Sequence, residues 1–315
     1  MNTKKVLKLT TIITCLALAS CEKEEKDDNA NSAINSSDDC STVITNTDGP
    51  KAGDTYISLM ANYDNTVIDS LIGISGSDKT WDFSNLTESG LDNDTIIFKS
   101  ETNIPSGIDA NLVLVGNSDL FLKSHPAGLD ITALEYDAEE EVNIGFNFDV
   151  DVDVVNPLTI LPYTLKINKV LIDDFKIQGY ISDTLDTLDL GGFLGEQYNI
   201  PFEVNIDISN SNEFSFDGCG IIITPKGEFN CLRFIVETGQ TESEVNATAL
   251  VEGTNTNIPQ SLIEEYLDID ELTDDINFNF YEGTTYVWIS KDHGYPLVQV
   301  KIDDNGNIEH VEYLK

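Results

Sequence analysis

Three aspartates at alternate positions, Asp149, Asp151 and Asp153, are the residues of this sequence best spaced to hold a metal ion. Alternate residues of a strand project from one face, which would place neighbouring carboxylates about 7 Å apart. Calcium prefers oxygen ligands, and a bound Ca²⁺ ion would relieve the repulsion between these charges. A solvated strand face explains the same pattern without a ligand, and we favour it. The expectation is therefore no cofactor, with calcium as the alternative.

The other residues that could do chemistry do not form a recognisable catalytic set. His125, His293 and His310 are far apart in the sequence, and no HExxH, G-x-S-x-G, P-loop or GxGxxG motif is present. Trp81 and Trp288 could act as sugar-stacking platforms, but both lie in strand-like segments, where core packing is favoured. We expect a binding or structural protein and not an enzyme.

The N-terminus has the pattern of a secretory signal. Lys4, Lys5 and Lys8 precede a short apolar run from Leu9 to Ala19. A helix of this length rises about 1.5 Å per residue and cannot cross a hydrocarbon core of about 30 Å. Residues 1–20 are therefore predicted to be a signal peptide.

Two short motifs follow this signal. The segment Leu18-Ala19-Ser20-Cys21 resembles the lipobox of bacterial lipoproteins, which implies cleavage before Cys21 and a diacylglycerol on its thiol. The next segment, Lys23-Glu24-Glu25, resembles the lipoprotein export signal of Bacteroidota, which implies an outer-membrane protein facing the cell surface. A plain solvated tether explains the second motif equally simply. The lipid would be the contact with the membrane.

The amino-acid composition distinguishes an N-terminal tether from the body of the protein, and the net charge excludes nucleic acid as a partner. Residues 21–50 are acidic and poor in large apolar side chains, so they are predicted to be disordered. The formal net charge of the chain is −39, with Arg233 as its only arginine. Such a surface repels phosphate backbones, which excludes nucleic acid as a partner.

Residues 51–315 read as short strands separated by turn residues. Strict alternation from Phe146 to Val154 is the strongest strand signal, and turns are predicted at Thr224–Gly227 and Asp304–Asn307. One strand is expected to end at Ile208 and another to begin at Ile221. Asp183, Asp186 and Asp189 are assigned to a solvated loop, and the only helix to 259–267. The fold class is all-β, mainly antiparallel: a large sandwich or half-barrel with one short helix. A break near 136–156 would divide it into two subdomains.

Four segments of this body resemble uncharacterised β-rich exported proteins of Bacteroidota. They are 80–86 (TWDFSNL), 157–163 (PLTILPY), 220–233 (GIIITPKGEFNCLR) and 286–297 (YVWISKDHGYPL). The C-terminal part also resembles Lol-type half-barrel domains of unknown function. That resemblance implies a concave sheet able to cover an apolar ligand, and it brings no catalytic residues.

Covalent modification is predicted at two further kinds of site. Cys219 and Cys231 flank a predicted hairpin and are candidates for a disulfide, which leaves Cys40 without a partner. The aspartate–hydroxyl–aliphatic pattern of Bacteroidota O-glycosylation matches at Ser70, Thr95, Thr184 and Thr187.

These observations favour a surface-anchored lipoprotein with a binding or structural role at the bacterial envelope. One alternative is a half-barrel carrier of a lipid or other apolar ligand, and another is a glycan-acting hydrolase. A glycan, an apolar ligand or an envelope protein are the partners expected beyond the membrane itself.

Overall fold

The structure is a computed structural model, and it describes part of the chain. The described residues are 44–90, 94–100, 104, 107–115, 119–135, 150–163, 170–188, 197–239, 242–251, 254–259, 283–303 and 305–315. Several predicted features lie outside these ranges: the signal peptide, Cys21, Lys23, Glu24, Glu25, Cys40, Asp149 and residues 260–267. The predicted break near 136–156 falls partly on 136–149, which is also outside, and partly on a strand.

The described residues form seventeen strands and one short helix, which confirms the predicted all-β class. The helix α2 spans Asn65–Ile72. The strands are β1 (Thr55–Asn62), β2 (Gly76–Asp82), β3 (Thr87–Glu88), β4 (Asp94–Ser100), β5 (Leu112–Val115), β6 (Asp119–His125), β7 (Gly128–Glu135), β8 (Val150–Asn156), β9 (Leu158–Pro162), β10 (Val170–Leu188), β11 (Gln197–Thr224), β12 (Gly227–Thr238), β13 (Glu242–Val251), β14 (Thr254–Asn257), β15 (Gly283–Ile289), β16 (Pro296–Ile302) and β17 (Ile308–Leu314).

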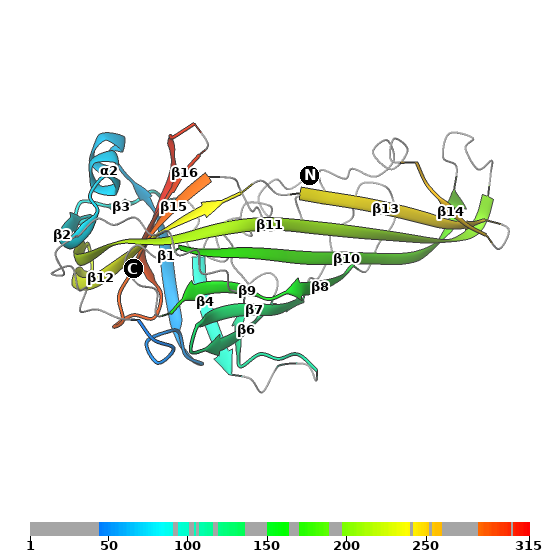
Figure 1. Ribbon diagram of the computed structural model, residues 1–315, viewed down its shortest axis with the longest axis horizontal. Coiled ribbons are helices and arrows are strands. Elements are labelled where there is room, and N and C mark those ends of the chain that lie inside the picture. The colour runs from blue at the N-terminus through cyan, green and yellow to red at the C-terminus, as the bar shows by residue number, and fades with distance from the viewer. Residues whose placement is uncertain are drawn as a thin grey trace, which may run out of the picture.

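Antiparallel pairing links most strands in one continuous order. The order is β9–β7–β6–β5–β4–β1–β17–β16–β15–β12–β11–β10–β8. Strand β13 pairs with the first part of β11, and β2 joins β11 in parallel. The two end strands, β8 and β9, are separated in sequence only by Pro157. The sheet therefore curls until it is nearly closed, as expected of a half-barrel (Figure 1).

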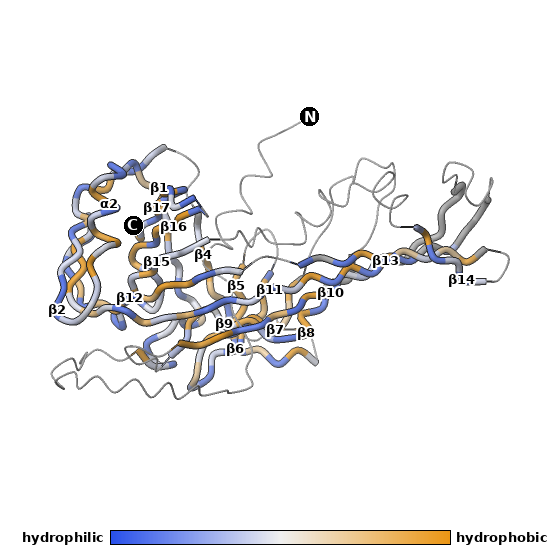
Figure 2. Tube along the Cα trace, turned by 45° about the horizontal axis from the view of Figure 1, so that its top comes forward, coloured by the Kyte–Doolittle hydropathy of each residue, from blue (hydrophilic) through white to orange (hydrophobic). Residues whose placement is uncertain are grey.

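Three long strands, β10, β11 and β13, run along the longest axis of the molecule (Figure 1). Apolar and polar residues alternate along them, as the changing colours of Figure 2 show. Ile177, Val204 and Ile206 are at most 1 % exposed. Because side chains alternate between the two faces of a strand, this pattern puts one face into the core.

Strands β10 and β11 are longer than the sequence predicted. Asp183 and Asp186 belong to β10 and not to a loop. The chain does not leave the sheet between Ile208 and Ile221, because β11 continues without a break for 28 residues. Pairing with β10 and β12 satisfies the backbone of this polar stretch, and tertiary context thereby overrides its turn-like composition.

Both predicted hairpin turns are present. Thr224 pairs with Gly227 between β11 and β12, and the Thr224 hydroxyl accepts a hydrogen bond from the Lys226 amide at 3.1 Å. Between β16 and β17, Asp303 Oδ1 accepts from the Asn307 amide at 2.8 Å, and Gly306 adopts a left-handed φ of 81°. The residue types demanded by tight turns account for both.

One glycine of the motif 220–233 has a packing reason. Strand β2 crosses so close to β11 that a Cβ at Gly220 would lie 2.0 Å from the backbone oxygen of Lys79. No side chain fits there, so glycine is required for the parallel pairing of β2 with β11.

Helix α2 was not predicted, although its signals are in the sequence. The Asp64 side chain accepts a hydrogen bond from the Thr66 amide at 2.9 Å and caps the first turn. Ile68 and Leu71 are buried at helical spacing, and Gly73 caps the C-terminus. Only eight residues long, the helix is held by packing on the sheet more than by its own propensity.

Candidate functional site

A hollow of about 310 Å³ lies beside helix α2. The end of β1, the helix and the segment after β2 line it together. Its apolar lining consists of Val67, Ile68, Leu71, Phe83 and Leu86, and its other lining residues are Asn62, Tyr63, Asp64, Asp82 and Asn85. An apolar lining with a few polar groups is the usual composition of a small-molecule site.

Electrostatics make the rim of the hollow anionic. Hydrogen bonds from the Thr66 hydroxyl and amide lower the pKa of Asp64, and hydrogen bonds from Ser84 lower the pKa of Asp82. Both carboxylates are therefore charged at neutral pH. The Tyr63 hydroxyl donates to the carbonyls of Ile308 and Glu309 at 3.4 Å, which anchors its ring to β17. The arrangement can accept hydrogen bonds from a ligand above an apolar wall.

A second region, close to the helix, is built around Arg233. Its side chain is 1 % exposed and forms a two-pronged ion pair with Asp217, with Nε donating to Oδ1 at 2.8 Å and Nη2 donating to Oδ2. The pairing of β11 with β12 shifts register between Phe216 and Gly218, which makes Asp217 the extra residue of a bulge. A bulge redirects the side chain that it carries, and here the bulged side chain meets Arg233.

The remaining contacts of Arg233 join the helix to the aromatic core. Nη1 donates to the carbonyl oxygens of Ile72 at 2.7 Å and Leu71 at 3.4 Å, at the C-terminal end of the helix. The Leu71 carbonyl also accepts from the Ile74 amide at 3.1 Å. The guanidinium carbon lies 5.2 to 5.6 Å from the ring centroids of three aromatic residues, Trp81, Tyr286 and Trp288. Trp81 and Trp288 are fully buried. Core packing is confirmed for both tryptophans.

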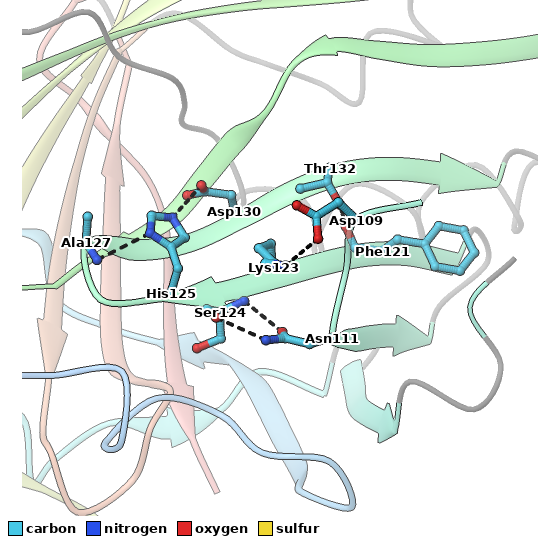
Figure 3. A network of polar contacts seen from close by, with 9 residues as sticks. All are labelled: Asp109, Asn111, Phe121, Lys123, Ser124, His125, Ala127, Asp130 and Thr132. Atoms are coloured by element: carbon cyan, nitrogen blue, oxygen red, sulfur yellow. Dashed lines mark hydrogen bonds and ion pairs between the residues drawn. The ribbon is translucent and has the colours of Figure 1, made fainter. Parts of the chain in front are cut away.

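A third polar region surrounds the turn between β6 and β7 (Figure 3). His125 Nδ1 accepts a hydrogen bond from the Ala127 amide at 3.3 Å, so Nε2 carries the proton and donates to Asp130 Oδ2 at 2.6 Å. The Asn111 side chain bonds to the backbone of Ser124 on β6: its amide nitrogen donates to the Ser124 carbonyl, and its amide oxygen accepts from the Ser124 amide. Lys123, also on β6, forms an ion pair with Asp109.

Asp130 and Asp173 are acidic groups without a Lys or Arg partner in the part of the chain that the structure describes. Asp130 Oδ1 and Asp173 Oδ2 are buried and make no hydrogen bond. Burial, together with the smaller effects of the nearby Asp130 and Asp174 charges, raises the pKa of Asp173 to about 8. No sequence motif marks either residue.

The predicted row of aspartates lies on a strand, as expected, but only in part within the described residues. Asp151 and Asp153 belong to β8 and pair with Tyr180 and Gln178 of β10. Asp153 is exposed to solvent, and Asp149 lies outside the described ranges. Among the described residues, no group of three or more His, Cys, Asp and Glu side chains is placed to hold a metal.

The predicted disulfide between Cys219 and Cys231 is wrong. Cys231 is a buried free thiol whose pKa burial raises to about 12, while Cys219 is disulfide-bonded to a residue outside the described part. Cys219 lies opposite Leu232, and Cys231 lies opposite Gly220. An offset of one residue points the two side chains to opposite faces of the sheet, which prevents the bridge.

The candidate glycosylation residues lie on separate elements. Ser70 is exposed on α2, where its hydroxyl donates to the Val67 carbonyl at 2.7 Å, and Thr95 is exposed on β4. Thr184 and Thr187 lie on β10, opposite Pro201 and Tyr198 of β11. Their modification stays a prediction.

The three histidines have different surroundings and share no site among the described residues. His293 packs edge-on against Phe229, and burial lowers its pKa. His310 on β17 is more deeply buried, which lowers its pKa to about 4. His125 belongs to the network of Figure 3.

No family model, curated protein or solved structure matches this chain. None of the helices in the described ranges has the length and apolar character that a membrane crossing requires.

Proposed function

We propose that this protein is a cell-surface lipoprotein, anchored through Cys21, which binds a saccharide unit in the hollow beside α2. The address is supported by the signal-like residues 1–20, the lipobox-like segment before Cys21 and the acidic run Lys23-Glu24-Glu25. The composition of the hollow supports the binding role.

The residues that line the hollow are the reason for proposing a saccharide as the ligand. A sugar ring has an apolar C–H face and a rim of hydroxyl groups. The apolar face can pack against Val67 and Phe83, and the hydroxyl groups can donate hydrogen bonds to the carboxylates of Asp64 and Asp82. A volume of about 310 Å³ is at the small end of ligand sites, which favours one or two sugar units over a lipid chain.

A single cell-based experiment tests both the address and the site. Cells producing the full chain are stained with an antibody against it and incubated with a panel of fluorescent glycans. Val67→Trp places a bulky ring in the hollow, and Val170→Trp makes the same change at a 53 % exposed position on β10. Cys21→Ala removes the proposed anchor.

We expect antibody staining with the parent chain and with both tryptophan variants, and its loss with Cys21→Ala. One glycan class should bind the parent and Val170→Trp equally, and Val67→Trp at least about tenfold more weakly, equivalent to about 1.4 kcal/mol. Staining that survives in Cys21→Ala rejects the anchor. Glycan binding that is absent, or equal in the two tryptophan variants, rejects the hollow as a saccharide site.

A further inference from the structure

Two buried side chains that face each other across β10 and β11 have polar atoms without a hydrogen-bond partner. Asp173 and Asn212 are directly opposed in the register, and they are 2 % and 0 % exposed. Oδ2 of Asp173 and both amide atoms of Asn212 lack partners. Opposed residues of an antiparallel pair project from the same face with Cβ atoms about 4.5–5.5 Å apart. The carboxylate and the amide therefore share one buried space.

Asp130 of β7 brings a second carboxylate to this region. Its Oδ1 is buried and unpartnered, while His125 holds its other oxygen (Figure 3). Asp130 pairs with Thr159 of β9, the strand that follows β8 directly, and β8 in turn pairs with β10, the strand of Asp173. The charge of Asp130 also raises the pKa of Asp173. No Lys or Arg side chain within the described ranges pairs with Asp130 or Asp173.

Such atoms are costly to leave unmatched, and native proteins satisfy them with an internal group, a water molecule or an ion. Water alone can supply hydrogen bonds but provides no counter-charge for Asp173 in its ionised form. The available ligands are carboxylate and amide oxygens, which are hard donors with no sulfur or free imidazole among them. This set matches Ca²⁺ better than zinc or copper.

We propose that Asp173, Asn212 and Asp130 hold a Ca²⁺ ion inside the sheet, with two carboxylates and the Asn212 amide oxygen as its protein ligands. Water molecules complete its shell, and one of them accepts a hydrogen bond from Asn212 Nδ2. The ion links β7 to the β10–β11 pair. This site is separate from the hollow and from the row of Asp151 and Asp153 on β8.

The test compares thermal unfolding of the full chain at neutral pH in a chelator and in excess Ca²⁺. When Ca²⁺ exceeds its dissociation constant about a hundredfold, we expect the melting temperature to rise by roughly 5–10 °C. Asp173→Asn and Asn212→Leu should each lose this rise. Asp153→Asn, which removes an exposed carboxylate from β8, should keep it.

Calorimetric titration of the chelator-treated chain with Ca²⁺ gives a second measurement that does not depend on the stability of the variants. One site is expected in the parent and in Asp153→Asn, and its loss in Asn212→Leu. The proposal is overturned if Ca²⁺ neither binds nor shifts the melting temperature, or if Asp173→Asn retains the full shift. If Ca²⁺ leaves the melting temperature unchanged and acidification raises it, then a proton on the buried carboxyl, and not Ca²⁺, neutralises this region, and the proposal is overturned.

Discussion

Arg233 on β12 and Asp173 on β10 are both almost completely buried, but only Arg233 has its charge matched. Asp217, two helix carbonyls and three aromatic rings surround the guanidinium. Asp173 instead faces an unpartnered amide and a second acidic residue. Burial penalises both charges, so the difference lies in what each strand pairing places opposite them. The first region is complete within the chain, whereas the second needs a proton or a cation.

Removing the arginine should cause the largest change in stability. Arg233→Met leaves the Asp217 carboxylate and the Ile72 carbonyl without the donor that Arg233 provides, so we expect a loss of about 3–5 kcal/mol in the free energy of unfolding. Urea denaturation measures it. Arg233→Lys keeps the charge but loses the two-pronged geometry, and it should fall between the parent and Arg233→Met. A loss below about 1 kcal/mol for Arg233→Met would mean that the two regions do not differ as described.

The region around Asp173 should make the free energy of unfolding depend on pH. In a chelator, unfolded Asp173 loses its proton near its ordinary pKa of 3.8, while the folded chain keeps it to about 8. Between these values the folded state binds more protons, so this residue makes the free energy of unfolding fall as pH rises, by at most about 1.4 kcal/mol per pH unit. The full contribution is present below pH 3.8 and is lost as pH passes 8.

Asp173→Asn should remove that slope and make the chain more stable than the parent at pH 8. Urea denaturation from pH 4 to pH 8 in a chelator measures the difference between the two chains, which cancels the other titrating groups. Identical slopes in the parent and in Asp173→Asn would show that the carboxyl is not held in its protonated form.

The smallest change in stability is expected at a partly exposed ion pair that involves β10, the strand of Asp173. Lys176 Nζ lies 2.9 Å from Asp207 Oδ2, and both side chains are about one third exposed. Lys176→Gln should change the free energy of unfolding by less than about 1 kcal/mol, because solvent screens the pair. Urea denaturation in low and in high salt measures it. A loss as large as that of Arg233→Met would show that burial is not what separates the regions.

Strand pattern and turns were predictable because they depend on neighbouring residues. The turns at Thr224–Gly227 and Asp303–Asn307 are where the sequence places them, and the alternation before Val154 continues into β8. The continuation of β11 through Asn210 and Asn212 was missed because asparagine ordinarily indicates a turn. Cys219 and Cys231 were assigned to the right hairpin and the wrong register, since one residue decides which face a side chain takes.

None of the sites described above follows from the sequence pattern alone. The hollow joins β1, α2 and the segment after β2, and Arg233 reaches residues more than 150 positions away. These contacts depend on which strands become neighbours when the sheet closes, and residue types do not specify that order.

The sequence by itself therefore determined the β class, the alternation of faces and the turns, because each arises from the preferences of adjacent residues. Tertiary structure alone decided that Asp217 meets Arg233 and that Asp173 meets Asn212. The bulge at Asp217 and the register of β10 on β11 bring these side chains together, and both result from how the long strands pair. Strand pairing therefore decides whether a buried charged group has a partner within the chain.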